Sequence, residues 1–245
     1  MCQWKCRDEL VVFITHACNL KDQHPDCDQR IAHSNYSMDL DSFEKVLSVC
    51  QDREWTKFEF FGGEPFLNRL FGTFVTRARE TLNVRELAVT TNASFHSRVS
   101  DDVLSILDHV YITHYPGIND KEVLEIETRL RTLDVNWTVT RNELESCDAA
   151  GSDYGLNEVE IFKLAKECRR RSPSIYADKI FPCCIGEAIQ RTNPDIEPSW
   201  ISLSLDWYEQ IHRPYYPICG RCWYILELLG LPTCKPSNPL TSIEM

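Results

Sequence analysis

Gly62, Gly63, Glu64 and Pro65 form the segment whose residue types and spacing are best suited to bind a ligand. They follow Phe58-Glu59-Phe60-Phe61, an aromatic-rich run with one charge that is typical of a short buried strand. Adjacent glycines permit positive φ values and let another group approach the backbone closely. Pro65 fixes the exit of the turn, and Glu64 places a carboxylate at a strand end, where α/β proteins bind ligands. A plain strand-to-helix turn is the alternative interpretation.

The twelve cysteines of the 245-residue chain form an early and a late group, with only two between them. The early group is Cys2, Cys6, Cys18 and Cys27, and the late group is Cys168, Cys183, Cys184, Cys219, Cys222 and Cys234. No secretory signal segment is evident, so metal or iron–sulfur ligation is a better interpretation than disulfides. The CxxC at 219–222 brings two thiolates to one ion or cluster, with structural zinc as the competing interpretation.

The composition is ordinary for a soluble globular chain, with 43% hydrophobic and 26% charged residues. A formal net charge of −11 disfavours nucleic acid and anionic membranes as partners. The apolar run from Leu10 to Ile14 is far too short to span a bilayer, and its flanks do not fit a secretory segment. We therefore expect no membrane partner and a cytoplasmic location.

Strand and helix patterns alternate up to residue 141. The predicted strands are 10–16, 57–61, 86–91, 109–114 and 135–141, and the predicted helices are 41–50, 68–82, 101–107 and 120–130. This order and the short connections predict an α/β fold with a parallel sheet and right-handed crossovers. Five or six such units are too few for a closed eight-unit barrel. The carboxyl ends of the strands would place Cys18, Glu64, Asn92, His114 and Arg141 on one rim.

The remaining chain has a different character. An irregular segment near residue 150 separates it from the first part, so we predict one domain over 1–150 and another over 151–245. The second is predicted to contain a helix at 156–171 and then a hairpin at 175–184 that leads into Cys183 and Cys184.

Two segments together resemble the radical S-adenosylmethionine (radical SAM) superfamily. A first strand is followed by Cys18-Asn19-Leu20, and a second strand ends in Gly62-Gly63-Glu64-Pro65. The resemblance covers about residues 8–141. It implies an open partial (β/α) barrel of five to six parallel strand–helix units. It also implies a [4Fe–4S] cluster and S-adenosylmethionine, whose amino group the GGEP backbone and carboxylate would hold.

Further cofactor contacts follow from the same resemblance. Asn92 and Ser94 resemble a Thr-Asn-Gly segment near the methionine and ribose of the cofactor, although Ala93 stands where glycine is commoner. As rim residues, His114 and Arg141 could bind the carboxylate of the cofactor or the substrate. The alternative is that both are polar residues that meet solvent at strand ends.

The cysteine loop departs from the CxxxCxxC signature of the superfamily, because Asp22 and Pro25 stand where the second and third cysteines belong. Cys18 and Cys27 are the expected catalytic cluster ligands, and a short insertion would make His24 the third ligand, as histidine ligates iron in Rieske centres. Asp22 is a second choice, although a hard oxygen suits a sulfide cluster poorly. Cys2 or Cys6 could also supply a third thiolate. Loss of a functional cluster site would leave the same pattern, a missing cysteine and a short insertion.

The late cysteines resemble the twitch module, the shortened form of the SPASM extension of radical SAM enzymes. That module carries an auxiliary [4Fe–4S] cluster with one cysteine before a hairpin, one after it and a closing CxxC. The matching residues here are Cys168, then Cys183 or Cys184, and then Cys219 and Cys222, with Cys234 as a replacement for Cys168.

Two functions remain open from the sequence. The first is a radical SAM enzyme, an oxidoreductase or maturase. It would abstract hydrogen from a small molecule or peptide and take electrons from a flavodoxin or ferredoxin. The second is a catalytically degenerate protein that keeps the fold and the late metal centre and acts as a binding partner or carrier. A structural zinc protein is a third possibility.

Overall fold

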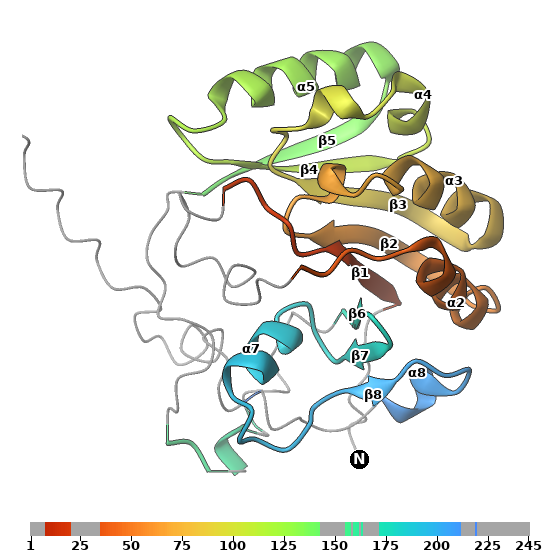
Figure 1. Cartoon of the computed structure of the whole chain (residues 1–245), viewed down its shortest axis with the longest axis vertical. Coiled ribbons are helices and arrows are strands. Elements are labelled where there is room, and N and C mark those ends of the chain that lie inside the picture. The colour runs from red at the N-terminus through yellow and green to blue at the C-terminus, as the bar shows by residue number, and fades with distance from the viewer. Residues whose placement is uncertain are drawn as a thin grey trace, which may run out of the picture.

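A computed structural model describes the placement of residues 8–20, 35–142, 155–157, 159–161, 163, 172–211 and 219. Most of these residues form one sheet with helices packed against it (Figure 1). Within the described part of the chain, no helix is both long enough and apolar enough to cross a membrane.

The sheet has the strand order β5-β4-β3-β2-β1-β6-β7-β8. β1 to β6 pair in parallel, whereas β7 and β8 are antiparallel additions. The sheet is open, with β5 and β8 as its edges in the described residues, so the predicted partial (β/α) barrel is confirmed. Its strands are β1 (Glu9–Thr15), β2 (Glu54–Gly62), β3 (Asn83–Thr91), β4 (His109–His114), β5 (Asn136–Arg141), β6 (Ser174–Tyr176), β7 (Lys179–Phe181) and β8 (Ile201–Ser202).

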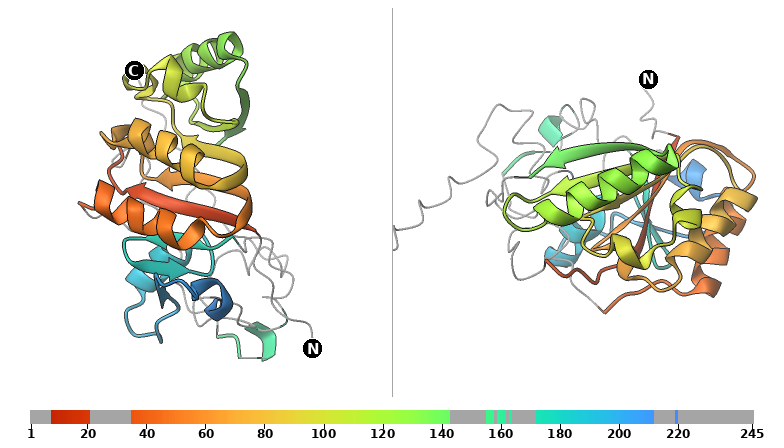
Figure 2. Two further views of the ribbon diagram at one scale, coloured as in Figure 1. Left: turned by 90° about the vertical axis from the view of Figure 1, so that its right-hand side faces the viewer. Right: turned by 90° about the horizontal axis from the view of Figure 1, so that it is seen from above.

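The helices that follow β1 to β4 lie on one face of the sheet, as Figure 2 shows. They are α2 (Leu40–Cys50), α3 (Phe71–Thr81), α4 (Asp101–Leu104) and α5 (Asp120–Leu133). The other elements are the 3-10 turns η1 (Pro65–Leu67) and η2 (His96–Arg98) and the helices α7 (Gly186–Thr192) and α8 (Trp207–Gln210). The helix predicted at 156–171 lies largely outside the described residues.

The helix after β2 begins later than the predicted residue 68. The first turn after Gly63 is the 3-10 turn η1, and the side chain of Asn68 then holds the chain in place. Asn68 Oδ1 accepts from Leu70 N at 2.8 Å, while its Nδ2 donates to Ile14 O at 2.8 Å. These contacts anchor the segment to the end of β1, so α3 begins only at Phe71.

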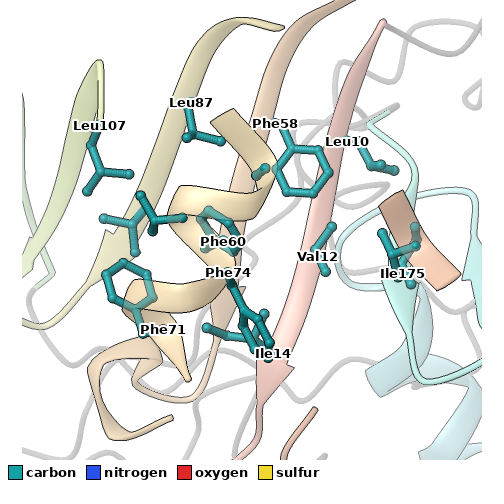
Figure 3. Packing of buried hydrophobic residues seen from close by; sticks show 14 of the residues in the cluster. Leu10, Val12, Ile14, Phe58, Phe60, Phe71, Phe74, Leu87, Leu107 and Ile175 are labelled. Carbon is teal, nitrogen blue, oxygen red and sulfur yellow. The ribbon is translucent and has the colours of Figure 1, made fainter. Parts of the chain in front are cut away.

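Alternate residues of the central strands form the core beneath the helices (Figure 3). Leu10, Val12 and Ile14 of β1 are buried there with Phe58 and Phe60 of β2. Each fully buried aliphatic or aromatic side chain contributes about 1.5–3 kcal/mol to stability. This packing holds the carboxyl ends of the parallel strands at one edge of the sheet.

The hairpin predicted in the late part of the chain is confirmed, with β6 and β7 pairing antiparallel. β6 also pairs in parallel with β1, where Val11 and Val12 face Ser174 and Ile175. The sheet of the first predicted domain therefore continues into the second. The proposed boundary near residue 150 falls outside the described residues and stays a prediction.

Candidate active site

The Gly62–Gly63 turn lies directly against the chain that follows β1. Gly63 N donates to Thr15 O at 2.9 Å, and Glu64 N donates to Ala17 O at 2.7 Å. A Cβ on Gly62, where φ is +143°, would lie 2.0 Å from Thr15 O, and one on Gly63 would lie 2.3 Å from Ala17 O. Only glycine fits either position, and the group that makes the close approach is the backbone leading into the cysteine loop.

Glu64 is turned into the protein and is 0% exposed. Its Oε1 accepts from Phe66 N at 3.0 Å and from Thr91 Oγ1 at 2.8 Å, and its Oε2 accepts from Asn92 N at 2.7 Å. Burial raises the pKa of Glu64 to about 7, and the three hydrogen bonds oppose that rise. The carboxylate therefore ties the turn after β2 to the end of β3. Oε2 accepts from only one of these donors and retains a lone pair, so it can still accept from a ligand amino group. That contact stays a prediction.

Asn92 connects this network to Cys18, which is partly exposed. Its Nδ2 lies 3.8 Å from Cys18 Sγ and donates to Asn19 Oδ1 at 3.0 Å. Its Oδ1 accepts from Ser94 N at 2.9 Å. Ala93, between them, has φ +64°, a conformation that favours glycine. The structure thus brings Cys18, Asn92 and Ser94 together with the GGEP turn.

His114 and Arg141 lie at the same edge but farther along the sheet. They are partners in the register of β4 and β5, and two strands separate β4 from β1. His114 Nε2 lies 2.5 Å from Asp120 Oδ1, a contact that holds the pKa of Asp120 below its usual range. A role for either residue in ligand binding stays a prediction.

The sequence interpretation missed Asn119, which is 1% exposed. Its Nδ2 donates to Asn92 O at 2.7 Å and to Thr113 O at 2.9 Å, and its Oδ1 accepts from Tyr115 N at 2.7 Å. It therefore clamps the ends of β3 and β4 beside the site. An asparagine just before a helix is expected to cap that helix, but Asn119 makes no side-chain cap bond. Its neighbours in space could not be recognised from the sequence.

The predicted metal ligands are only partly described. Cys183, Cys184 and Cys219 are partly buried and pack against the core, but His24, Cys27, Cys168, Cys222 and Cys234 lie outside the described residues. In the ranges that the structure covers, no three His, Cys, Asp or Glu side chains are grouped to hold a metal. Each predicted cluster needs ligands from outside those ranges, so both stay predictions.

Known structures share the fold of this chain. The crystal structure of BtrN in complex with AdoMet (S-adenosylmethionine) and 2-DOIA matches with a TM-score of 0.59 at 12% identity, over 85% of this chain and 83% of that one. Streptococcus suis SuiB bound to precursor peptide SuiA matches with a TM-score of 0.51 at 10% identity, over 96% and 76%. These similarities establish the fold. No protein-family model and no curated protein matches the sequence.

The buried Glu64 carboxyl predicts a specific pH dependence of stability. Its pKa is about 7 in the folded chain against an ordinary value of 4.5, so the folded state binds more protons between these two pH values. The free energy of unfolding should therefore fall as pH rises from about 4.5 to 7, by up to ~3 kcal/mol from this group. Urea unfolding of Glu64→Gln across this range should lack that decrease. The exposed Glu197→Gln variant should retain it, and parallel pH curves for wild type and Glu64→Gln would contradict the assignment.

Proposed function

We propose that the chain is a radical S-adenosylmethionine enzyme, which cleaves that cofactor reductively and abstracts hydrogen from a substrate. The observation that carries the proposal is the convergence of Cys18, Asn92 and the GGEP turn at one edge of the sheet. Asn92 reaches Cys18 Sγ through its side chain and Glu64 through its backbone N–H. The similarity in fold to BtrN, whose structure contains AdoMet, supports it.

Cys18 and Cys27 would hold a [4Fe–4S] cluster, with His24 as the third ligand from the loop. When bound, such a cluster supplies the electron that cleaves the sulfonium of the cofactor. The described residues fit this role, because a partly exposed thiol lies at a strand end beside an amide donor. The glycine turn holds the backbone before Cys18 in place, and Asn92 orients the thiol.

The cofactor would lie along the same edge. Gly62, Gly63, Glu64 and Pro65 would hold its amino group, and Asn92 and Ser94 would lie near its methionine and ribose. His114 and Arg141 would meet its carboxylate or the substrate. In this proposal Glu64 also acts through its neighbours, because it fixes both the turn after β2 and the start of the Asn92 segment.

The proposed substrate is a peptide or a small molecule. SuiB is seen with a precursor peptide and BtrN with 2-DOIA, and the fold alone does not choose between these classes. Electrons would come from a flavodoxin or ferredoxin. Cys219 and Cys222, with Cys183 or Cys184 and with Cys168 or Cys234, would form an auxiliary cluster that assists an oxidation.

A catalytically degenerate protein is the second candidate function. The loop after β1 lacks the CxxxCxxC spacing, and this specific feature favours it. Such a protein would retain the fold and the late metal centre without cleaving the cofactor.

Removal of the late cysteines separates the two candidates. A chain with Cys183→Ala, Cys184→Ala and Cys222→Ala should lose the auxiliary cluster and keep the early one. After anaerobic iron–sulfur reconstitution and reduction, it should give a [4Fe–4S] signal in electron paramagnetic resonance whose shape changes when S-adenosylmethionine is added. Absence of any cluster signal, with no response to the cofactor, would favour the degenerate protein.

A further inference from the structure

A cavity of about 250 Å³ is lined by residues of the β6–β7 hairpin and of α7. Figure 1 shows where these elements lie in the fold. Pockets for drug-sized ligands measure ~300–1,000 Å³, so this one suits a smaller molecule. One of its lining residues, Tyr176, stacks on His16, two residues before Cys18, with ring centroids 4.6 Å apart. Its walls include Tyr176, Lys179, Phe181, Glu187, Arg191 and Trp200.

A buried carboxylate lines this cavity. Glu187 is 4% exposed, and its Oε1 accepts from Arg191 Nε at 2.9 Å and also from Arg191 Nη2. Its Oε2 is buried and has no hydrogen-bond partner in the described part of the chain. Because buried polar atoms in native proteins are nearly always hydrogen-bonded, this oxygen indicates a missing donor. Burial also raises the pKa of Glu187, against the lowering effect of Arg191, so an added donor would stabilise its charge.

Two cations share the cavity with Glu187. Lys179 Nζ lies 4.6 Å from the centroid of the Trp200 ring, and the Arg191 guanidinium lies 5.6 Å from that of Tyr176. Arg191 is already engaged, since its Nη2 also donates to Tyr176 Oη at 3.2 Å. The pair of Arg191 and Glu187 is therefore close to neutral, and Lys179 adds one positive charge to the wall. A matching ligand offers an anion to Lys179 and a donor to Glu187 Oε2.

We propose that this cavity binds the zwitterionic head of a free α-amino acid. The ligand ammonium would donate to Glu187 Oε2, and its carboxylate would pair with Lys179. Charged hydrogen bonds of this kind are about twice as strong as neutral ones, which favours a zwitterion over a polyol. The rings of Tyr176, Phe181 and Trp200 offer contact to an apolar side chain. The proposal does not depend on cofactor cleavage, because none of these residues belongs to the GGEP turn or the cysteine loop.

Calorimetry on the full chain with L-leucine tests this proposal. Wild type should bind L-leucine, and N-acetyl-L-leucine and L-leucinamide, which each lack one charge, should bind at least tenfold more weakly. Glu187→Gln and Lys179→Met should each weaken L-leucine binding by at least tenfold as well. Glu197→Gln, an exposed carboxylate after α7, is the matched control and should bind like wild type.

Three results would overturn the proposal. They are no binding of L-leucine up to about 10 mM, equal binding by wild type and both cavity variants, and binding of glucose in place of L-leucine. Lys179→Met leaves the ion pair of Glu187 with Arg191 intact, so it keeps the test valid if Glu187→Gln fails to fold. Near-ultraviolet circular dichroism identifies that failure.

Discussion

Replacement of Gly62 by alanine should destabilise the protein by more than ~3 kcal/mol and abolish S-adenosylmethionine binding. The new Cβ would lie 2.0 Å from Thr15 O and 3.1 Å from Thr15 C, both of them backbone atoms of β1. A backbone φ of +143° adds strain for any residue with a side chain. Relief of the clash requires β1 and β2 to move apart at the edge where Cys18 lies. Urea unfolding and calorimetry with the cofactor measure the two effects.

Gly117→Ala is the matched control for this variant. Gly117 also has a positive φ, +77°, but a Cβ there would meet nothing within 4 Å. Gly117→Ala should therefore lower the free energy of unfolding by only about 1–2 kcal/mol, which is the cost of the left-handed conformation for alanine. Cofactor binding should be unchanged. If both alanine variants lost the same stability, the close approach of Gly62 to Thr15 would not be what the fold requires.

Replacement of Cys18 by alanine should remove the early cluster and all cleavage of S-adenosylmethionine. Cys18 is the one predicted early ligand that the described residues contain, and Asn92 Nδ2 lies 3.8 Å from its Sγ. The proposed [4Fe–4S] cluster has three protein ligands, and without the Cys18 thiolate the loop would supply only two. The measurement is iron and sulfide per chain after anaerobic reconstitution, in a background that lacks the late cysteines.

Cys50→Ala is the control for the loss of a cysteine. Cys50 lies in the core on α2 and is 0% exposed, and burial raises the pKa of its thiol far above the usual value. A buried, protonated thiol is a poor metal ligand, so the iron content of this variant should equal that of the unchanged chain. Full iron content in Cys18→Ala would contradict the proposed site.

The parallel sheet could be predicted because its signals are local. Strand 109–114 was predicted at its observed bounds, and the strands 10–16, 57–61, 86–91 and 135–141 were predicted to within three residues at each end. Strand β8 was not predicted. Alternating burial and helical spacing are properties of neighbouring residues, so they are visible in a single sequence. The rim of the sheet followed directly, since parallel strands end at a common edge.

The contacts that shape the site are not local. Two glycines indicated a close approach, but the structure identifies the approaching group as the backbone of Thr15 and Ala17, more than forty residues earlier. The ligand contact expected of Glu64 stays a prediction, and the sequence could not show that three donors of the protein also bind its carboxylate. Asn119 shows the same limitation, because it donates to the backbone of Asn92, which follows a different strand.

Formation of 5′-deoxyadenosine tests the central proposal most directly. The full chain is reconstituted anaerobically, reduced with dithionite and incubated with S-adenosylmethionine, and the products are separated by chromatography. We predict 5′-deoxyadenosine and methionine in equal amounts, dependent on the reductant and absent with Cys18→Ala. A wild-type chain that carries a full early cluster, binds the cofactor and forms no 5′-deoxyadenosine would contradict it.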